Sequence, residues 1–89
     1  MPVTVEALEG AFPVEPAVGE LAQFDYDDKL ERFIGDVVLQ LFRGMSVPDR
    51  QKFLWDRLKA TFGEDADQVS LILAYAPEEW EESLHRQAG

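Results

Sequence analysis

Four glutamates near the C-terminus are the residues of this sequence best placed for acid–base chemistry: Glu78, Glu79, Glu81 and Glu82. Paired carboxylates can act as general acid and general base, but they need a reacting group beside them. The chain has no cysteine, and no other nucleophile or base accompanies these glutamates. A charged helix face is therefore the favoured interpretation. We predict that the protein is not an enzyme and has no catalytic residue.

Two further groups could bind a metal ion. Asp25, Asp27 and Asp28 form an acidic cluster, but they lack the glycine and the distant bidentate glutamate of a calcium-binding loop. A solvated turn explains them better. His85 is the only histidine, and an exposed histidine near the end of a helix explains it without a metal. We predict neither a metal ligand nor a bound cofactor.

The best candidate for a binding surface is the trio Arg50, Phe53 and Arg57. Aromatic residues and arginines are enriched at interface hot spots, and this spacing places all three on one face of a helix. We predict that the trio binds a protein partner. The alternative is structural: Phe53 covers the edge of a sheet, and both arginines pair with nearby acidic residues.

A helix between Ser46 and Gly63 must position the trio. Ser46 and Asp49 have the spacing of a capping box, Pro48 suits a first turn, and Gly63 ends the pattern. The apolar stripe expected of this helix comprises Val47, Leu54, Leu58 and Phe62, with Trp55 at its margin.

The sequence signals for the other helices and strands are less clear. Thr4 can cap a short helix that presents Val5, Leu8 and Phe12 on one face and stops before Pro13. Alternation around Leu21 suggests a strand before an acidic turn at 25–28. Residues 30–42 fit an amphipathic helix best by periodicity, although Val37, Leu39 and Leu41 also alternate as in a strand. Residues 69–75 alternate as a strand, and Pro77 then begins a final helix.

Composition and charge restrict the class of protein. The 89 residues suffice for one small domain, 1–89, and the hydrophobic fraction of 46% favours a folded chain. No apolar run approaches the roughly 20 residues of a membrane span, and the N-terminus lacks the basic start of a signal peptide. We expect a soluble cytoplasmic protein that makes no contact with a membrane.

The formal net charge of −10 also disfavours nucleic acid as a partner. Residues 1–31 hold eight acidic residues and one base, and residues 64–82 hold seven acidic residues and no base. Only residues 45–62 are locally basic, with four bases against two acids. A binder of nucleic acid needs a basic surface to neutralise phosphates, whereas the field of this chain repels them.

Three segments follow one another along the chain: "FRGMS" (Phe42–Ser46), "RQKFLWDRL" (Arg50–Leu58) and "AYAPEEW" (Ala74–Trp80). In their order and spacing they resemble the BolA family. The resemblance implies an α/β (α+β) sandwich of the order αββαβα with a three-stranded sheet, similar to the type II KH fold. It also replaces the helix suggested for residues 33–42 by the second strand.

The departures from the family matter for function. BolA proteins place a histidine at the start of the last strand, where it helps a monothiol glutaredoxin to hold a [2Fe–2S] cluster. The matching position here is Gln68, and a glutamine amide is a poor ligand for iron. The histidine-rich loop of the family also has no counterpart in this chain.

The resemblance and these departures lead to a ranking of functions. The first is a non-enzymatic accessory or regulatory factor that binds a protein partner through Arg50, Phe53 and Arg57. The alternative is an iron–sulfur trafficking partner of a monothiol glutaredoxin. A transcriptional regulator that binds DNA is the least favoured, because of the acidic charge.

Overall fold

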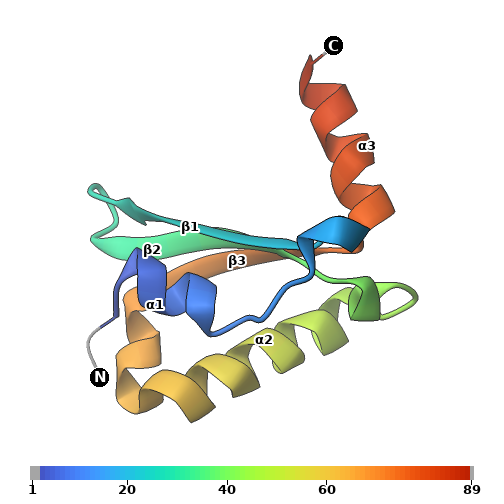
Figure 1. Cartoon of the computed structure of the whole chain (residues 1–89). Helices are drawn as coiled ribbons and strands as arrows, with labels where there is room; N and C mark the ends of the chain where they lie inside the picture. The colour runs from blue at the N-terminus through green and yellow to red at the C-terminus, as the bar shows by residue number, and fades with distance from the viewer. Residues whose placement is uncertain (1–2, 89) are drawn as a thin grey trace.

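The protein is built on a three-stranded mixed sheet, with two helices on one face and a third helix rising from the other (Figure 1). The computed structural model describes the backbone of residues 3–88 and the side chains of residues 3–85. The α-helices, 3-10 helices (η) and strands are α1 (Val5–Gly10), η1 (Pro16–Val18), β1 (Leu21–Asp27), β2 (Arg32–Val38), η2 (Gln40–Phe42), α2 (Val47–Phe62), η3 (Gly63–Gln68), β3 (Val69–Tyr75) and α3 (Pro77–Ala88). The protein thus has an α+β fold with the α-helices and strands in the order αββαβα.

The sheet has the strand order β1-β2-β3, so that β2 is central and β3 lies at an edge. β1 and β2 pair antiparallel, from Leu21 opposite Val38 to Asp27 opposite Arg32. β2 and β3 pair in parallel, which requires a long crossover, and α2 provides it. The crossover brings the end of β3 and the start of α3 close to the beginning of α2.

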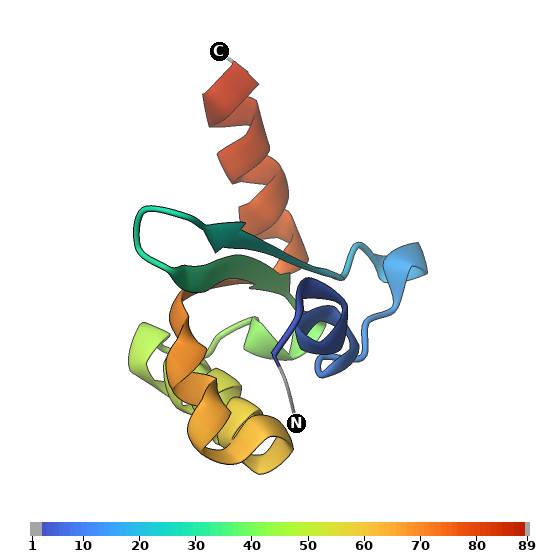
Figure 2. The same ribbon diagram turned by 90° about the vertical axis from the view of Figure 1, so that its left-hand side faces the viewer.

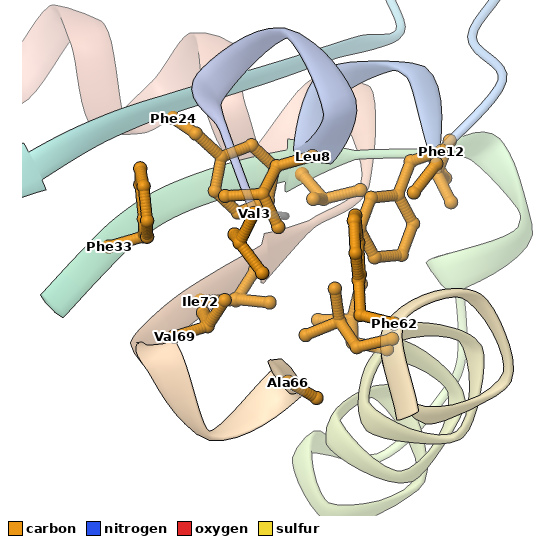
Figure 3. Close-up of a cluster of buried hydrophobic side chains, with 14 of the residues drawn as sticks. Val3, Leu8, Phe12, Phe24, Phe33, Phe62, Ala66, Val69 and Ile72 are labelled. Atoms are coloured by element: carbon orange, nitrogen blue, oxygen red, sulfur yellow. The ribbon is translucent and has the colours of Figure 1, made fainter. Parts of the chain in front are cut away.

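The core lies between the sheet and the helices α1 and α2 (Figures 2 and 3). Phe33 and Val37 of β2 are buried, and Gly35 lies between them. Across the antiparallel pair, Phe24 lies opposite Gly35 and also stacks on Phe12, with the two ring centroids 6.1 Å apart. The other large core side chains come from the helices, the connections and β3, and include Leu8, Leu39, Phe42, Leu54, Leu58, Phe62, Val69 and Ile72.

The local signals for α2 are confirmed. The Ser46 hydroxyl accepts a hydrogen bond from the Asp49 N–H (3.3 Å), and Gly63 ends the helix with φ of 60°. The predicted apolar stripe is wrong for one residue: Val47, in the first turn of α2, is 69% exposed. Arg50 is the buried residue nearest the start of the helix.

Residues 32–38 form a strand, so the helix suggested by periodicity is wrong and the strand implied by the BolA resemblance is right. The strand is shorter than expected, because residues 40–42 turn into η2. The acidic turn also lies later than expected. Asp25 and Asp27 belong to β1, and the Asp27 carboxylate accepts hydrogen bonds from the N–H groups of Lys29 and Leu30. Asp27 therefore stabilises the turn at residues 28–31.

The strand at 69–75 and the helix that begins at Pro77 are both confirmed. Thr4 also caps α1, since its hydroxyl accepts a hydrogen bond from the Ala7 N–H (3.0 Å). Within the described part of the chain, every helix is too short or too polar to span a lipid bilayer.

Candidate protein-interaction site

Arg50 of α2 lies at the junction of three elements. Its guanidinium donates hydrogen bonds to the Met45 carbonyl (3.0 Å), to the Ala74 carbonyl of β3 (3.2 Å) and to the Glu79 carboxylate of α3 (2.6 and 3.1 Å). The residue is only 7% exposed. The hydrogen bonds between the pair raise the pKa of Arg50 and lower the pKa of Glu79. Both groups are therefore held in their charged forms.

A second ion pair lies beside the first. Arg43 donates to Glu78 through two nitrogen atoms, at 2.6 and 2.8 Å. The hydrogen bonds from Arg43, and then the Glu78 backbone N–H, lower the pKa of Glu78 from its ordinary value near 4.5 to about 2. Both side chains are about half exposed, so water weakens this pair more than the pair of Arg50 and Glu79.

Together the two pairs hold the first turn of α3 against the rest of the fold. The Glu79 carboxylate also accepts a hydrogen bond from the Ala76 N–H (2.8 Å), which satisfies a donor at the helix start. Pro77 at the first helical position has no N–H to satisfy. Two of the four glutamates considered for catalysis, Glu78 and Glu79, are thus engaged in positioning α3.

Phe53 and Arg57 lie at a hollow between α2, η2 and the segment that follows α1. The Phe53 ring is partly buried and meets the Phe42 ring edge to face, with 5.7 Å between the centroids. Arg57 is exposed, and its Nε donates to the Ala11 carbonyl. The residues that line this hollow, called the Phe53 hollow below, are Phe12, Pro13, Glu20, Leu39, Leu41, Phe53 and Arg57.

The structure therefore divides the trio predicted from the sequence. It brings Phe53 and Arg57 together at one hollow, beside the exposed side chain of Leu41. Arg50 is directed instead into the junction of α2, β3 and α3, and its pairing with Glu79 agrees with the structural alternative. Binding of a partner by these residues stays a prediction, with Phe53 and Arg57 as the accessible members.

A network that no sequence pattern predicted covers the outer edge of β3. The Gln51 side-chain amide donates to the Ile72 carbonyl (2.8 Å) and accepts from the Trp55 indole (3.1 Å). With the bond from Arg50 to Ala74, two carbonyls of the edge strand are occupied by α2. An edge strand with unpaired backbone groups invites pairing with another chain, and these bonds reduce that tendency. In a single sequence, nothing distinguishes a glutamine with this role from any other glutamine in a helix.

The polar residues considered for metal binding are dispersed. Gln68 is exposed at the end of η3, directly before the first residue of β3, and His85 is exposed on α3. Within residues 3–88, no three histidine, aspartate or glutamate side chains form a group that could hold a metal ion.

Comparisons with known proteins find no relative of this chain. The chain matches no protein-family model, and no curated protein or solved structure is significantly similar to it.

Proposed function

We propose that the protein is a BolA-like, non-enzymatic interaction module that acts as an accessory or regulatory factor for a protein partner. The αββαβα order and the mixed sheet are compatible with the type II KH-like fold of that family. The three segments that carry the resemblance lie around and within α2 and at the start of α3. Phe42–Ser46 precedes α2, Arg50–Leu58 lies within α2, and Ala74–Trp80 joins β3 to α3.

The Phe53 hollow is the observation that carries the proposal. It combines a partly buried aromatic ring, an exposed arginine and Leu41, which is 49% exposed. Residues of these types release water from apolar surface on binding and also supply directional hydrogen bonds. The hollow offers a partner an apolar anchor point with the positive charge of Arg57 and the negative charge of Glu20 beside it.

Capture of partners from extracts of the native cell tests this proposal. The chain is immobilised as wild type, Phe53→Ala, Arg57→Glu and Lys59→Glu. Lys59→Glu reverses the same charge on an exposed residue of the same helix and is the matched control. Circular dichroism establishes that each variant is folded. We expect the first two variants to lose a protein that wild type and Lys59→Glu retain. Equal recovery by all four would refute the proposed surface.

A second candidate function is iron–sulfur trafficking with a monothiol glutaredoxin. The exposed position of Gln68, directly before Val69 of β3, favours it, because the family places its ligand histidine there. The residue present does not fit a cluster ligand, since an amide binds iron far more weakly than imidazole does. In this candidate function the glutaredoxin and glutathione would supply the ligands, and this chain would act by binding the glutaredoxin.

A further inference from the structure

A second apolar surface lies on the far side of Glu20 from the Phe53 hollow, between η1 and α3. Its walls are the segment Pro16–Leu21 and the side of α3 that presents Pro77, Trp80 and Leu84. Val18 and Leu84 are 42% and 44% exposed, although both are large apolar residues. Trp80, on the α3 wall, is partly buried, and the centroid of its ring lies 5.2 Å from that of Tyr75. We call this surface the α3 groove.

The groove is open because α3 stands away from the sheet. Figure 1 shows the helix rising from the end of β3, with only its base against the other elements. The pairs Arg43–Glu78 and Arg50–Glu79 hold that base, so the helix has a fixed direction where it leaves the sheet. Trp80 and Leu84 are one helical turn apart and therefore lie on the same side. An apolar side on a helix held in this way is suited to a partner.

The charge around the groove decides which partner fits. Glu20, Glu78 and Glu81 line it, and no lysine or arginine does so among the described side chains. Arg43, outside the groove, already pairs with Glu78, which leaves Glu20 and Glu81 to attract a cationic partner. A second copy of this chain would bring the same glutamates and a net charge of −10 against them, which is unfavourable. A segment with lysine or arginine beside its apolar residues would have the opposite charge.

The backbone of the groove decides the conformation of the partner. The N–H groups of Ala17, Val18, Gly19 and Glu20 already donate to Glu15 or Pro16. The other wall is a helix, whose backbone bonds are internal. The carbonyl groups of an extended peptide would therefore find none of these four N–H groups free, whereas a helix satisfies its own backbone groups.

We propose that the α3 groove binds a basic amphipathic helix of a protein partner. Apolar side chains of that helix lie between Val18 and Leu84 against Trp80, and flanking lysine or arginine side chains reach Glu81 and Glu20. The α3 wall of the groove runs from Pro77 to Leu84, about 12 Å, so about two turns of the partner are in contact. This surface is separate from Phe53 and Arg57, and the inference does not depend on the function proposed for them.

A synthetic helix of leucine and lysine, about 14 residues long with its leucines on one face, is the probe. Fluorescence anisotropy of the labelled peptide measures its affinity for the full chain. The variants are Val18→Lys and Leu84→Lys in the groove, and Leu71→Lys on the open face of the sheet as the control. All three positions are exposed, so the variants are expected to fold. A peptide of the same composition with scrambled order, which has no apolar face, is the control for charge alone.

We expect each groove variant to weaken binding about tenfold or more, as loss of an interface hot spot does. Leu71→Lys should stay within about twofold of wild type, and added salt should weaken binding by wild type. Equal binding by wild type and the groove variants, or equal binding of the scrambled peptide, overturns the proposal. Loss of binding in Leu71→Lys alone would place the site on the sheet instead. Self-association of the free wild type that Leu84→Lys abolishes would identify a second copy as the occupant.

Discussion

The ring of Phe24 lies against the Cα of Gly35, its partner across the β1–β2 pair. A Cβ added to Gly35 would lie 2.6 Å from Cε2 of the Phe24 ring and 2.7 Å from the Gln23 carbonyl oxygen. Neither group can move freely, because Phe24 is buried against Phe12 and Gln23 belongs to β1. The glycine is thus required by the close approach of the neighbouring strand.

Gly35→Ala should therefore destabilise the fold. We expect the free energy of unfolding to fall by about 1–3 kcal/mol, the range for overpacked cores. Urea denaturation monitored by circular dichroism measures it. Gly10→Ala is the control, because a Cβ there meets no atom within 4 Å. It should be neutral or slightly stabilising, and equal losses in both variants would show that the contact with Phe24 has no effect.

Replacing Arg50 by methionine should also destabilise the protein. The change leaves the carbonyls of Met45 and Ala74 without their donor and Glu79 without its counter-ion. We expect the free energy of unfolding to fall by about 2–3 kcal/mol. The fall is smaller than for a fully buried pair because Glu79 is half exposed. Lys52→Met, which removes an exposed charge from the same helix, should change little. Equal stability of the two variants would contradict the role given to Arg50.

The attachment of α3 should depend on pH. The pKa of Glu78 is lowered in the folded state, so its contribution to stability is complete above pH 4.5 and declines as the pH falls toward 2. The pKa of Glu79 is lowered as well, which acts in the same direction. Tyr75 and Trp80 report on the base of α3, since their rings are in contact. Their near-ultraviolet circular dichroism should change over this acid range.

Two variants, each with one glutamate neutralised, test this acid response: Glu78→Gln is the test and Glu81→Gln is its control. Glu78→Gln should make the near-ultraviolet signal less dependent on pH between 4.5 and 2, because it removes the titrating group. Glu81→Gln removes a charge from the same helix without touching the contact with Arg43. If both variants follow the wild-type curve, the pair Arg43–Glu78 does not govern the attachment.

Restoring a histidine at Gln68 should restore cluster chemistry if the chain is BolA-like. Gln68 is exposed, so Gln68→His should change stability by no more than about 0.5 kcal/mol. Mixed with a monothiol glutaredoxin, glutathione, iron and sulfide, the variant should give a visible spectrum that the wild type does not. Ser70→His, another exposed position nearby, is the control and should give none. A confirmed heterodimer without a new spectrum would contradict the equivalence of Gln68 with the family's histidine.

Local signals predicted the helices better than the central strand. Ser46, Gly63 and Pro77 act through adjacent residues, so the bounds of α2 and the start of α3 could be inferred from the sequence. In contrast, the spacing of Phe33 and Val37 suits one face of a helix as well as alternate positions of a strand. Pairing with β1 and β3 decides between them, and that pairing joins segments distant in sequence.

The candidate site was predictable only in part for the same reason. The positions of Phe53 and Arg57 on one face of α2 follow from helical periodicity. The partner of Arg50 does not, because Glu79 belongs to another helix and meets Arg50 only after the crossover places β3 beside α2. Acidic residues are so numerous in this sequence that charge alone could not identify which of them would pair.

Photocrosslinking in the native cell tests most directly whether the Phe53 hollow binds a protein partner. Benzoylphenylalanine replaces Leu41 in the Phe53 hollow or, as the control, Leu30 in the β1–β2 turn. The two leucines are similarly exposed, at 49% and 54%. We expect a crosslink from position 41 to another protein, none from position 30 to that protein, and loss of the first in an Arg57→Glu background. Crosslinking to the same protein from both positions, or from position 41 regardless of Arg57→Glu, would contradict binding of a partner at the hollow.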